Sequence, residues 1–299
     1  MSAIHNVTTA GSGVMGSQVA WQFAFHGKDV TVYDAFDAGL EKGKTFHEQF
    51  GQEFIAKRGA TEAEVQAAHG RLTYTSDLNR AVSRAELIVE QIPEHLELKR
   101  EFWGKVSEAA PEEAIFCSNC STLLPSDIQV AVSKRPERFL SFHFCVKVWE
   151  SNIGEIMLTP TTDEKYWKQV IEFAREVGLV PVPIRKEQLG YVLNSLLVPF
   201  TIDALKLAAK GVADAATIDR VWRICMANVG PMEMADKMGI KTLEGRFRDF
   251  AEESGDPEMM QMVDYLKKEY VDKGKFGTTT GEGFYTYPEP EFEKDDFLS

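Results

Sequence analysis

Short apolar runs alternate with longer stretches of helical periodicity in the first part of the chain. The short runs are rich in β-branched and aromatic residues and predict strands at 6–11, 29–34, 85–92, 114–119, 139–144, 154–160 and 179–184. Between the earlier runs, residues 15–27 and 96–110 carry apolar side chains at the spacing of a helix. Strands that alternate with helices predict a doubly wound, mainly parallel sheet with both faces covered.

The pattern changes after the charged segment at residues 184–190. From Tyr191 onward the apolar residues recur at three- and four-residue spacing, first over 193–211 and again over 216–230. We therefore predict an α/β domain over residues 1–185, followed by an all-α domain over 186–299.

Composition and charge exclude several classes of protein. The 299 residues suffice for two domains, and no apolar stretch reaches the ~18 residues of a membrane helix. A net charge of −13 argues against a nucleic-acid partner, which requires a concentrated basic surface. Four cysteines and no secretory signal at the N-terminus predict free thiols and a cytoplasmic protein without a membrane partner.

A glycine motif connects the first predicted strand to the first predicted helix. In AGSGVMGSQ the G-x-G-x-x-G arrangement comprises Gly11, Gly13, Val14, Met15 and Gly16. The first glycine allows a tight turn, the second allows a pyrophosphate to approach the backbone, and the third allows the helix to pack closely. The free N–H groups of the helix N-terminus would bind the phosphates. By itself this pattern could also be a loop that simply requires glycines.

Asp34 strengthens the nucleotide interpretation, because it ends the second predicted strand at the expected distance from the glycines. Its carboxylate can accept hydrogen bonds from both ribose hydroxyls and would repel a 2′-phosphate. We therefore predict a Rossmann-type domain that binds NAD in preference to NADP.

His143 and Glu155 are candidates for proton transfer. His143 lies near the end of the predicted strand FLSFHF, and Glu155 lies at the start of the next one. If these strands are neighbours, the carboxylate would fix the tautomer of the imidazole and raise the basicity of its other nitrogen. The alternative is a hydrogen-bonded core histidine.

Several segments together resemble the L-3-hydroxyacyl-CoA dehydrogenase family over nearly the whole chain. They are GSGVMGSQVA, IVEQIPEHLELKREFW, CSNCSTLLPSDI, FHF followed by Glu155, GYVLNSLLVPF, NVGPMEMADKMG and GKFGTTTGEGFYTY, in the order of the family. LNSLLVP, KVW and STLLPSD are most similar to its diketoreductase-like branch. The resemblance implies a homodimer that transfers hydride reversibly between NAD and C3 of a 3-hydroxyacyl or 3-oxoacyl substrate, expected to be a CoA thioester.

The resemblance also implies roles for individual residues. His143 would be the catalytic acid and base with Glu155 as its partner, while Ser121 and Asn194 would hold the substrate. A second set of residues would line the cofactor site, namely Glu94, Lys99 and Asn119. Without the family, Glu94 and Lys99 would be interpreted as a charge pair on a solvated helix turn.

The cysteines near these residues allow a competing interpretation. Cys117, Cys120, His143 and Cys145 could supply four zinc ligands, because zinc prefers thiolates and imidazoles. Such a site would consume the proposed base, and Cys120 occupies a small polar position of the family's S-N-T-S loop. We therefore predict structural cysteines and no metal site.

The chain departs from the family in places that bear on the substrate. Val146 stands where the family has asparagine, Lys147 replaces a proline, and residues 278–280 read TTT. Trp149 and Trp222 are tentative substrate-pocket residues, with core packing as the alternative. These changes leave open a reductase of CoA-free β-keto or diketo esters, hydroxy acids or sugar acids. A non-catalytic NAD-binding protein is a third possibility.

Overall fold

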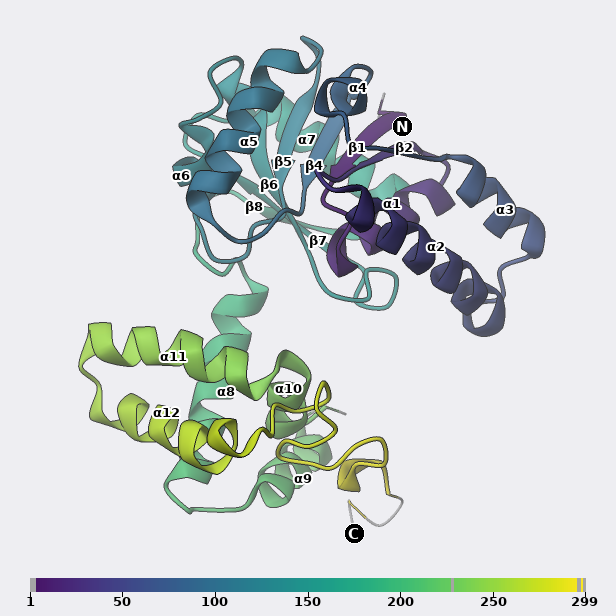
Figure 1. Cartoon of the computed structure of the whole chain (residues 1–299). Coiled ribbons are helices and arrows are strands. Elements are labelled where there is room, and N and C mark those ends of the chain that lie inside the picture. The colour runs from purple at the N-terminus through teal and green to yellow at the C-terminus, as the bar shows by residue number, and fades with distance from the viewer. Residues whose placement is uncertain (1–3, 227–228, 295–296, 298–299) are drawn as a thin grey trace. The chain divides into compact units, whose positions relative to one another are not determined.

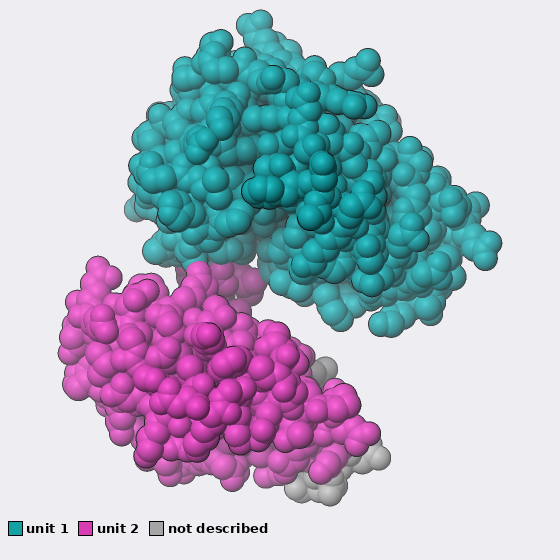
Figure 2. Space-filling model, viewed as in Figure 1, with its two compact units in different colours: residues 1–192 teal, residues 193–299 magenta. Residues whose placement is uncertain are grey.

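The computed structural model describes residues 4–226, 229–294 and 297 (Figure 1). The chain divides into two compact units, residues 1–192 and 193–299 (Figure 2). The first unit is a doubly wound α/β domain and the second is helical, which confirms the predicted fold class. The observed division follows Val192, seven residues beyond the boundary expected from the change in pattern (192 − 185 = 7).

The first unit is built on an eight-stranded sheet with the order β3-β2-β1-β4-β5-β6-β7-β8. Its strands are β1 (Asn6–Ala10), β2 (Asp29–Tyr33), β3 (Leu72–Thr75), β4 (Leu87–Glu90), β5 (Ile115–Ser118), β6 (Phe139–Phe144), β7 (Ile153–Leu158) and β8 (Val180–Ile184). The β6–β7 pair is antiparallel and the other neighbouring pairs are parallel. Sequence analysis did not predict β3, because this edge strand contributes only four residues, LTYT, of which two are buried.

Helices cover both faces of this sheet. They are α1 (Val14–Phe25), α2 (Asp37–Arg58), α3 (Glu62–Gly70), α4 (Leu78–Val82), α5 (Leu96–Ala109), α6 (Pro125–Gln129), the 3₁₀ helix η1 (Pro136–Arg138) and α7 (Glu164–Glu176). Successive strand residues point to opposite faces. Accordingly, Phe116 packs in one apolar cluster with Trp103, and its neighbour Cys117 packs in another with Trp21. Both faces are therefore buried, as the apolar strands predict.

The second unit contains α8 (Leu193–Ala209), α9 (Ala215–Cys225), α10 (Pro231–Met238), α11 (Ile240–Ser254), α12 (Pro257–Glu269) and the 3₁₀ helices η2 (Val271–Lys273) and η3 (Glu291–Glu293). Leu205, Met232, Phe247 and Leu266 belong to its own apolar core. Ala227 and Asn228, within the second predicted helix, lie outside the described residues. Among the described helices, none combines the length and apolar character that crossing a membrane requires.

Candidate active site

Ser121, His143 and Glu155 form a continuous series of hydrogen bonds. It lies at the end of the sheet where β5 and β6 finish and β7 begins. His143 on β6 and Glu155 on β7 are directly opposite each other in the antiparallel register. The Nδ1 atom of His143 lies 2.9 Å from Glu155 Oε2, and its Nε2 atom lies 2.9 Å from Ser121 Oγ. Because a carboxylate can only accept, Glu155 favours the tautomer with the proton on Nδ1, in which Nε2 accepts from Ser121. This tautomer leaves Nε2 as the basic nitrogen.

Tyr191 and Val192, the last residues of the first unit, hold the hydrogen-bonded series from Ser121 to Glu155 in place. The ring of Tyr191 stacks on the imidazole of His143, with centroids 4.4 Å apart and an interplanar angle of 11°. Its hydroxyl donates to the Cys120 carbonyl at 2.6 Å, and burial raises the pKa of that hydroxyl far above its usual value. The Val192 N–H donates to Glu155 Oε1 at 2.9 Å. Both oxygens of Glu155 therefore have partners.

Glu94 fixes the loop that carries Ser121. Its Oε1 atom accepts from the N–H groups of Ser121 and Thr122, both at 2.7 Å, and from the Thr122 hydroxyl at 2.9 Å. Burial raises the pKa of Glu94, but the Lys99 ammonium and hydrogen bonds from Cys120 and Thr122 outweigh it and lower the pKa below its usual value. Glu94 therefore stays ionised as an acceptor for the loop.

Lys99 lies beneath this loop in a buried network. It is 1% exposed, forms an ion pair with Glu90, and lies 3.7 Å from Glu94 Oε2. The Glu90 carboxylate also accepts from Ser118 Oγ at 2.8 Å and from Trp103 Nε1 at 3.3 Å. The alternative of a solvated charge pair is therefore wrong for Lys99, because the ends of β4 and β5 enclose its ammonium group.

The glycine motif forms a tight turn over the N-terminus of α1. Gly11 has φ +103°, and a Cβ there would lie 2.6 Å from the Gln91 carbonyl oxygen. A Cβ on Gly16 would lie 1.8 Å from the Gly11 oxygen, whereas one on Gly13 would have no atom within 4 Å. Val14 and Met15 begin α1, whose first turn has no acidic residue and exposes unpaired N–H groups. Open space at Gly13 beside free N–H groups fits a pyrophosphate.

Asp34 lies on a cavity of about 630 Å³ next to this turn. The cavity is walled by apolar side chains that include Leu78, Ile92, Pro93, Leu98 and Phe102. Asp34 Oδ2 accepts from Ser12 N at 3.0 Å and Ser12 Oγ at 2.7 Å, while Oδ1 accepts from Phe36 N at 3.1 Å. A carboxylate has about four acceptor positions, so capacity remains for a ribose hydroxyl. The turn, the carboxylate and the apolar walls thus fit the parts of NAD.

Asn119 and the loop after β6 are tied to neighbouring backbone. Asn119 Oδ1 accepts from the Phe144 N–H at 2.9 Å, so its amide oxygen holds the end of β6. Lys147 has φ +59°, which a proline ring does not permit, and its N–H donates to Gln18 Oε1 at 2.7 Å. Val146, beside it, is 61% exposed. The departures at Val146 and Lys147 therefore give this loop a different backbone path from one that contains proline.

Trp149 and Trp222, the two tentative pocket residues, differ in burial. Trp149 is buried, with its ring 4.9 Å from Phe50 and 5.1 Å from Phe54 between centroids. These aromatic contacts place its indole in the core, which favours the packing alternative for Trp149. Trp222, on α9, is half-buried and lies against Phe200, with centroids 4.1 Å apart. Its place in a substrate pocket stays a prediction.

The cysteines are free thiols, of which Cys117 and Cys120 are buried, Cys145 is half-buried and Cys225 is exposed. Burial raises the pKa of Cys117 well above its usual value, that of Cys120 to about 12, and that of Cys145 to about 11. A metal ligand has to be a thiolate, so these environments oppose zinc binding. Within residues 4–226, 229–294 and 297, no three His, Cys, Asp or Glu side chains are grouped to hold a metal ion.

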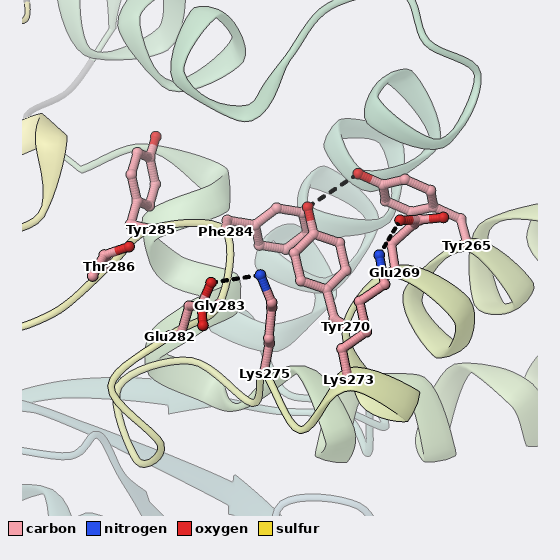
Figure 3. Close-up of a pocket in the computed structure, with 10 residues that line it drawn as sticks. All are labelled: Tyr265, Glu269, Tyr270, Lys273, Lys275, Glu282, Gly283, Phe284, Tyr285 and Thr286. Carbon is pink, nitrogen blue, oxygen red and sulfur yellow. Dashed lines mark hydrogen bonds and ion pairs between the residues drawn. The ribbon is translucent and has the colours of Figure 1, made fainter.

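The second unit contains Asn194 and a polar hollow. Asn194 lies in the first turn of α8, and its contact with a substrate stays a prediction. The hollow, of about 420 Å³, is lined by α12 and the C-terminal segment (Figure 3). Its lysines are ion-paired, Lys273 with Glu269 at 2.7 Å and Lys275 with Glu282 at 2.5 Å. Because these charges pair with one another, we assign it no ligand.

Sequence reasoning missed two residues of the site, Glu90 and Tyr191. Glu90 had a visible signal, since it is a carboxylate at the end of the apolar strand LIVE. Tyr191 had none, because nothing local to GYVLNS indicates contact with a strand far back in the chain.

Comparison with known proteins extends over the whole chain. A family profile described as "3-hydroxyacyl-CoA dehydrogenase, NAD binding domain" matches residues 6–188. A second, described as "3-hydroxyacyl-CoA dehydrogenase, C-terminal domain", matches residues 190–287.

Individual relatives give the same family. The human mitochondrial hydroxyacyl-coenzyme A dehydrogenase is 30% identical over 290 residues, which cover 95% of this chain and 91% of the relative. A 3-hydroxybutyryl-CoA dehydrogenase of Mycobacterium tuberculosis is 30% identical over 292 residues, covering 95% and 99%. A solved structure, described as a diketoreductase that acts on dicarbonyl compounds, is 43% identical with a TM-score of 0.88, covering 96% of this chain and all of that one.

Proposed function

The chain belongs to the 3-hydroxyacyl-CoA dehydrogenase family of NAD-dependent oxidoreductases, and we propose that its substrates are 3-hydroxyacyl and 3-oxoacyl thioesters of CoA. The reaction is a reversible hydride transfer between NAD and C3. The observation that carries the proposal is the chain from Ser121 through His143 to Glu155, which provides a neutral imidazole nitrogen for an alcohol proton.

NAD, when bound, supplies or accepts the hydride at its nicotinamide. In oxidation His143 Nε2 takes the proton of the C3 hydroxyl, and Nδ1–H remains hydrogen-bonded to Glu155. The Glu155 carboxylate stabilises the imidazolium that forms, as carboxylates do for acid/base histidines. In reduction the same nitrogen returns the proton to the oxygen.

Ser121 has the geometry to orient the reacting oxygen. Its hydroxyl lies 2.9 Å from the nitrogen that exchanges the proton, and Glu94 holds its backbone. A substrate oxygen bonded to Ser121 would thus lie near His143 Nε2, and we assign Asn194 a second hydrogen bond to the substrate. The main contribution of both residues is orientation and charge stabilisation.

A second candidate function is the reduction of CoA-free β-dicarbonyl compounds. Two observations favour it. The diketoreductase structure has higher identity to this chain than the two CoA dehydrogenases compared above, and the loop after β6 carries Val146 and Lys147 where the family has asparagine and proline. Both candidates use the same proton-transfer residues.

The deciding experiment compares substrates at neutral pH. NADH oxidation is followed with acetoacetyl-CoA, ethyl acetoacetate and a diketo ester, and NADPH serves as the cofactor control. Efficient turnover of acetoacetyl-CoA alone is the result that the CoA proposal expects. Preference for the CoA-free compounds would replace it with the second candidate. No turnover with intact NADH binding would favour a non-catalytic NAD-binding protein.

We further propose a homodimer formed by the helical unit. Leu196, Val212, Val221, Met226 and Phe250 are exposed apolar side chains on this unit. Such exposure is typical of surfaces that bind another chain. Light scattering of the purified protein would show twice the chain mass if the proposal holds.

The free thiols also support a cytoplasmic location, where cysteines stay reduced.

A further inference from the structure

Tyr191 contacts the proton-transfer chain in a way that the mechanism above does not use. It is a non-glycine residue with φ +56°, and it directly follows Gly190, with φ +79°. Left-handed backbone at a bulky residue is unfavourable and persists only where the surroundings enforce it. Here the turn points the tyrosine ring back onto β6, where it is 1% exposed.

Three contacts from this turn reach three different parts of the site. The ring covers one face of the His143 imidazole, 4.4 Å away between centroids. The hydroxyl donates to the carbonyl of Cys120, the residue before Ser121, at 2.6 Å. The next N–H, of Val192, donates to Glu155 at 2.9 Å. Two successive residues, Tyr191 and Val192, thus hold the imidazole of His143, the loop before Ser121 and the carboxylate of Glu155.

We propose that Tyr191 is a positioning residue that fixes the plane of His143 and the Ser121 loop for proton transfer. The inference rests on the proposed function of His143 as acid and base. An imidazole on a β-strand can rotate about its side-chain bonds, and Glu155 restrains it through one atom only. A parallel ring at 11° restrains the whole plane, so Nε2 stays directed at Ser121 and the substrate oxygen. A face-on aromatic ring also favours the cationic form that arises during oxidation.

Two variants separate the contributions of the ring and the hydroxyl. Tyr191→Leu removes the stacking, whereas Tyr191→Phe keeps the ring and removes the hydroxyl that donates to the Cys120 carbonyl. Tyr166→Leu is the matched control. Tyr166 is a buried tyrosine on α7 of the same unit, and it packs in a different apolar cluster from Tyr191. Loss of a buried aromatic ring should lower the melting temperature of both leucine variants.

The kinetic expectation follows from misplacement of the base. We expect kcat of Tyr191→Leu to fall roughly 10- to 100-fold, with NADH affinity nearly unchanged and an altered pH profile of kcat/KM. Tyr191→Phe should restore most of this loss, and Tyr166→Leu should keep the wild-type kcat and pH profile. A kcat for Tyr191→Leu equal to that of Tyr166→Leu would overturn the inference. Failure of Tyr191→Phe to restore activity would overturn the role given to ring stacking.

A spectroscopic measurement makes the result independent of substrate identity. In protein labelled with ¹⁵N-histidine, the His143 signals are assigned by their loss in His143→Gln. Wild-type protein should show one neutral tautomer with the proton on Nδ1, and Tyr191→Leu should show mixed or broadened signals. If wild type turns over no carbonyl substrate, the proposed function fails, but unchanged His143 signals in Tyr191→Leu would separately reject the role of Tyr191.

Discussion

Glu90 and Glu155 are two buried carboxylates on strands of one sheet. Their partners differ in chemistry, since Glu90 pairs with the ammonium of Lys99 and Glu155 with the imidazole of His143. Glu90 accepts from the ammonium of Lys99, the hydroxyl of Ser118 and the indole of Trp103, none of which is an imidazole. Glu155 accepts from the His143 imidazole and from the Val192 N–H, and the other nitrogen of that imidazole reaches a serine hydroxyl. Burial is the same in both regions, 0% and 1% exposed. The difference teaches that burial of a charge does not indicate chemistry unless its partner can exchange a proton.

The largest expected effect on activity is at the exchanging partner. His143→Gln should lower kcat by about 10²–10⁴-fold, because a positioned acid and base is replaced by an amide that does not titrate. NADH binding, followed by fluorescence, and the melting temperature should stay near wild type. Full activity of this variant would show that His143 is not the base and would remove the contrast between the two carboxylates.

The largest expected effect on stability is in the Glu90 region. Lys99→Met leaves Glu90 buried without a cation and should lower the free energy of unfolding by about 3–5 kcal/mol, measured by urea denaturation. The double variant Glu90→Gln, Lys99→Met should recover much of this loss, because no uncompensated charge remains. Lys134→Met is the control, since its pair with Glu108 is exposed and should contribute little to stability. Equal effects at both lysines would contradict a structural role for the buried pair.

His47 sharpens the comparison, because it is a buried histidine without a carboxylate. Its ring contacts the Tyr74 hydroxyl at 2.7 Å and the Ser17 carbonyl at 3.0 Å, and burial lowers its pKa from 6.5 to about 4. Between these pH values the unfolded chain binds more protons, so His47 makes stability fall as the pH decreases from 6.5 to 4. The expected loss is about 3 kcal/mol, from 1.36 kcal/mol per pKa unit.

Urea denaturation across this pH range checks the prediction against His47→Gln. Other groups titrate in both proteins, so the difference between the two pH profiles isolates His47. The variant should show a shallower decline toward acid pH. Parallel profiles would mean that His47 becomes protonated in the folded state, as His143 is proposed to do during turnover.

The smallest expected effect concerns a third carboxylate, Asp34, which borders an open cavity and has no cation among its described hydrogen-bond partners. Asp34→Ala should narrow the preference for NADH over NADPH by about 10-fold, since about 1.5 kcal/mol, the lower end of the contribution of a charge-assisted hydrogen bond, corresponds to that factor. The ratio of kcat/KM for the two cofactors measures this. Ser12→Ala should change the ratio less, because the carboxylate itself stays. An unchanged ratio in Asp34→Ala would reject its ribose role.

Much of the fold and part of the site could be predicted from local sequence. Strand and helix periods, the glycines at 11, 13 and 16 and the carboxylate of Asp34 act within one strand–turn–helix segment, so residue type and spacing suffice. His143 and Glu155 were also predictable, because adjacent antiparallel strands joined by a short loop have few possible registers.

The burial of Lys99 and Trp149 and the stacking of Tyr191 were decided only by the tertiary structure, because they depend on contacts between distant segments. Lys99 and Trp149 resemble surface or pocket residues in sequence, but strand ends enclose Lys99, and Phe50 and Phe54 from α2 enclose Trp149. Tyr191 lies against His143 only because the chain leaves β8 through a left-handed turn at the sheet edge. The physical reason is that side-chain period and turn chemistry are properties of a few neighbouring residues. Burial and stacking depend on the whole packed unit.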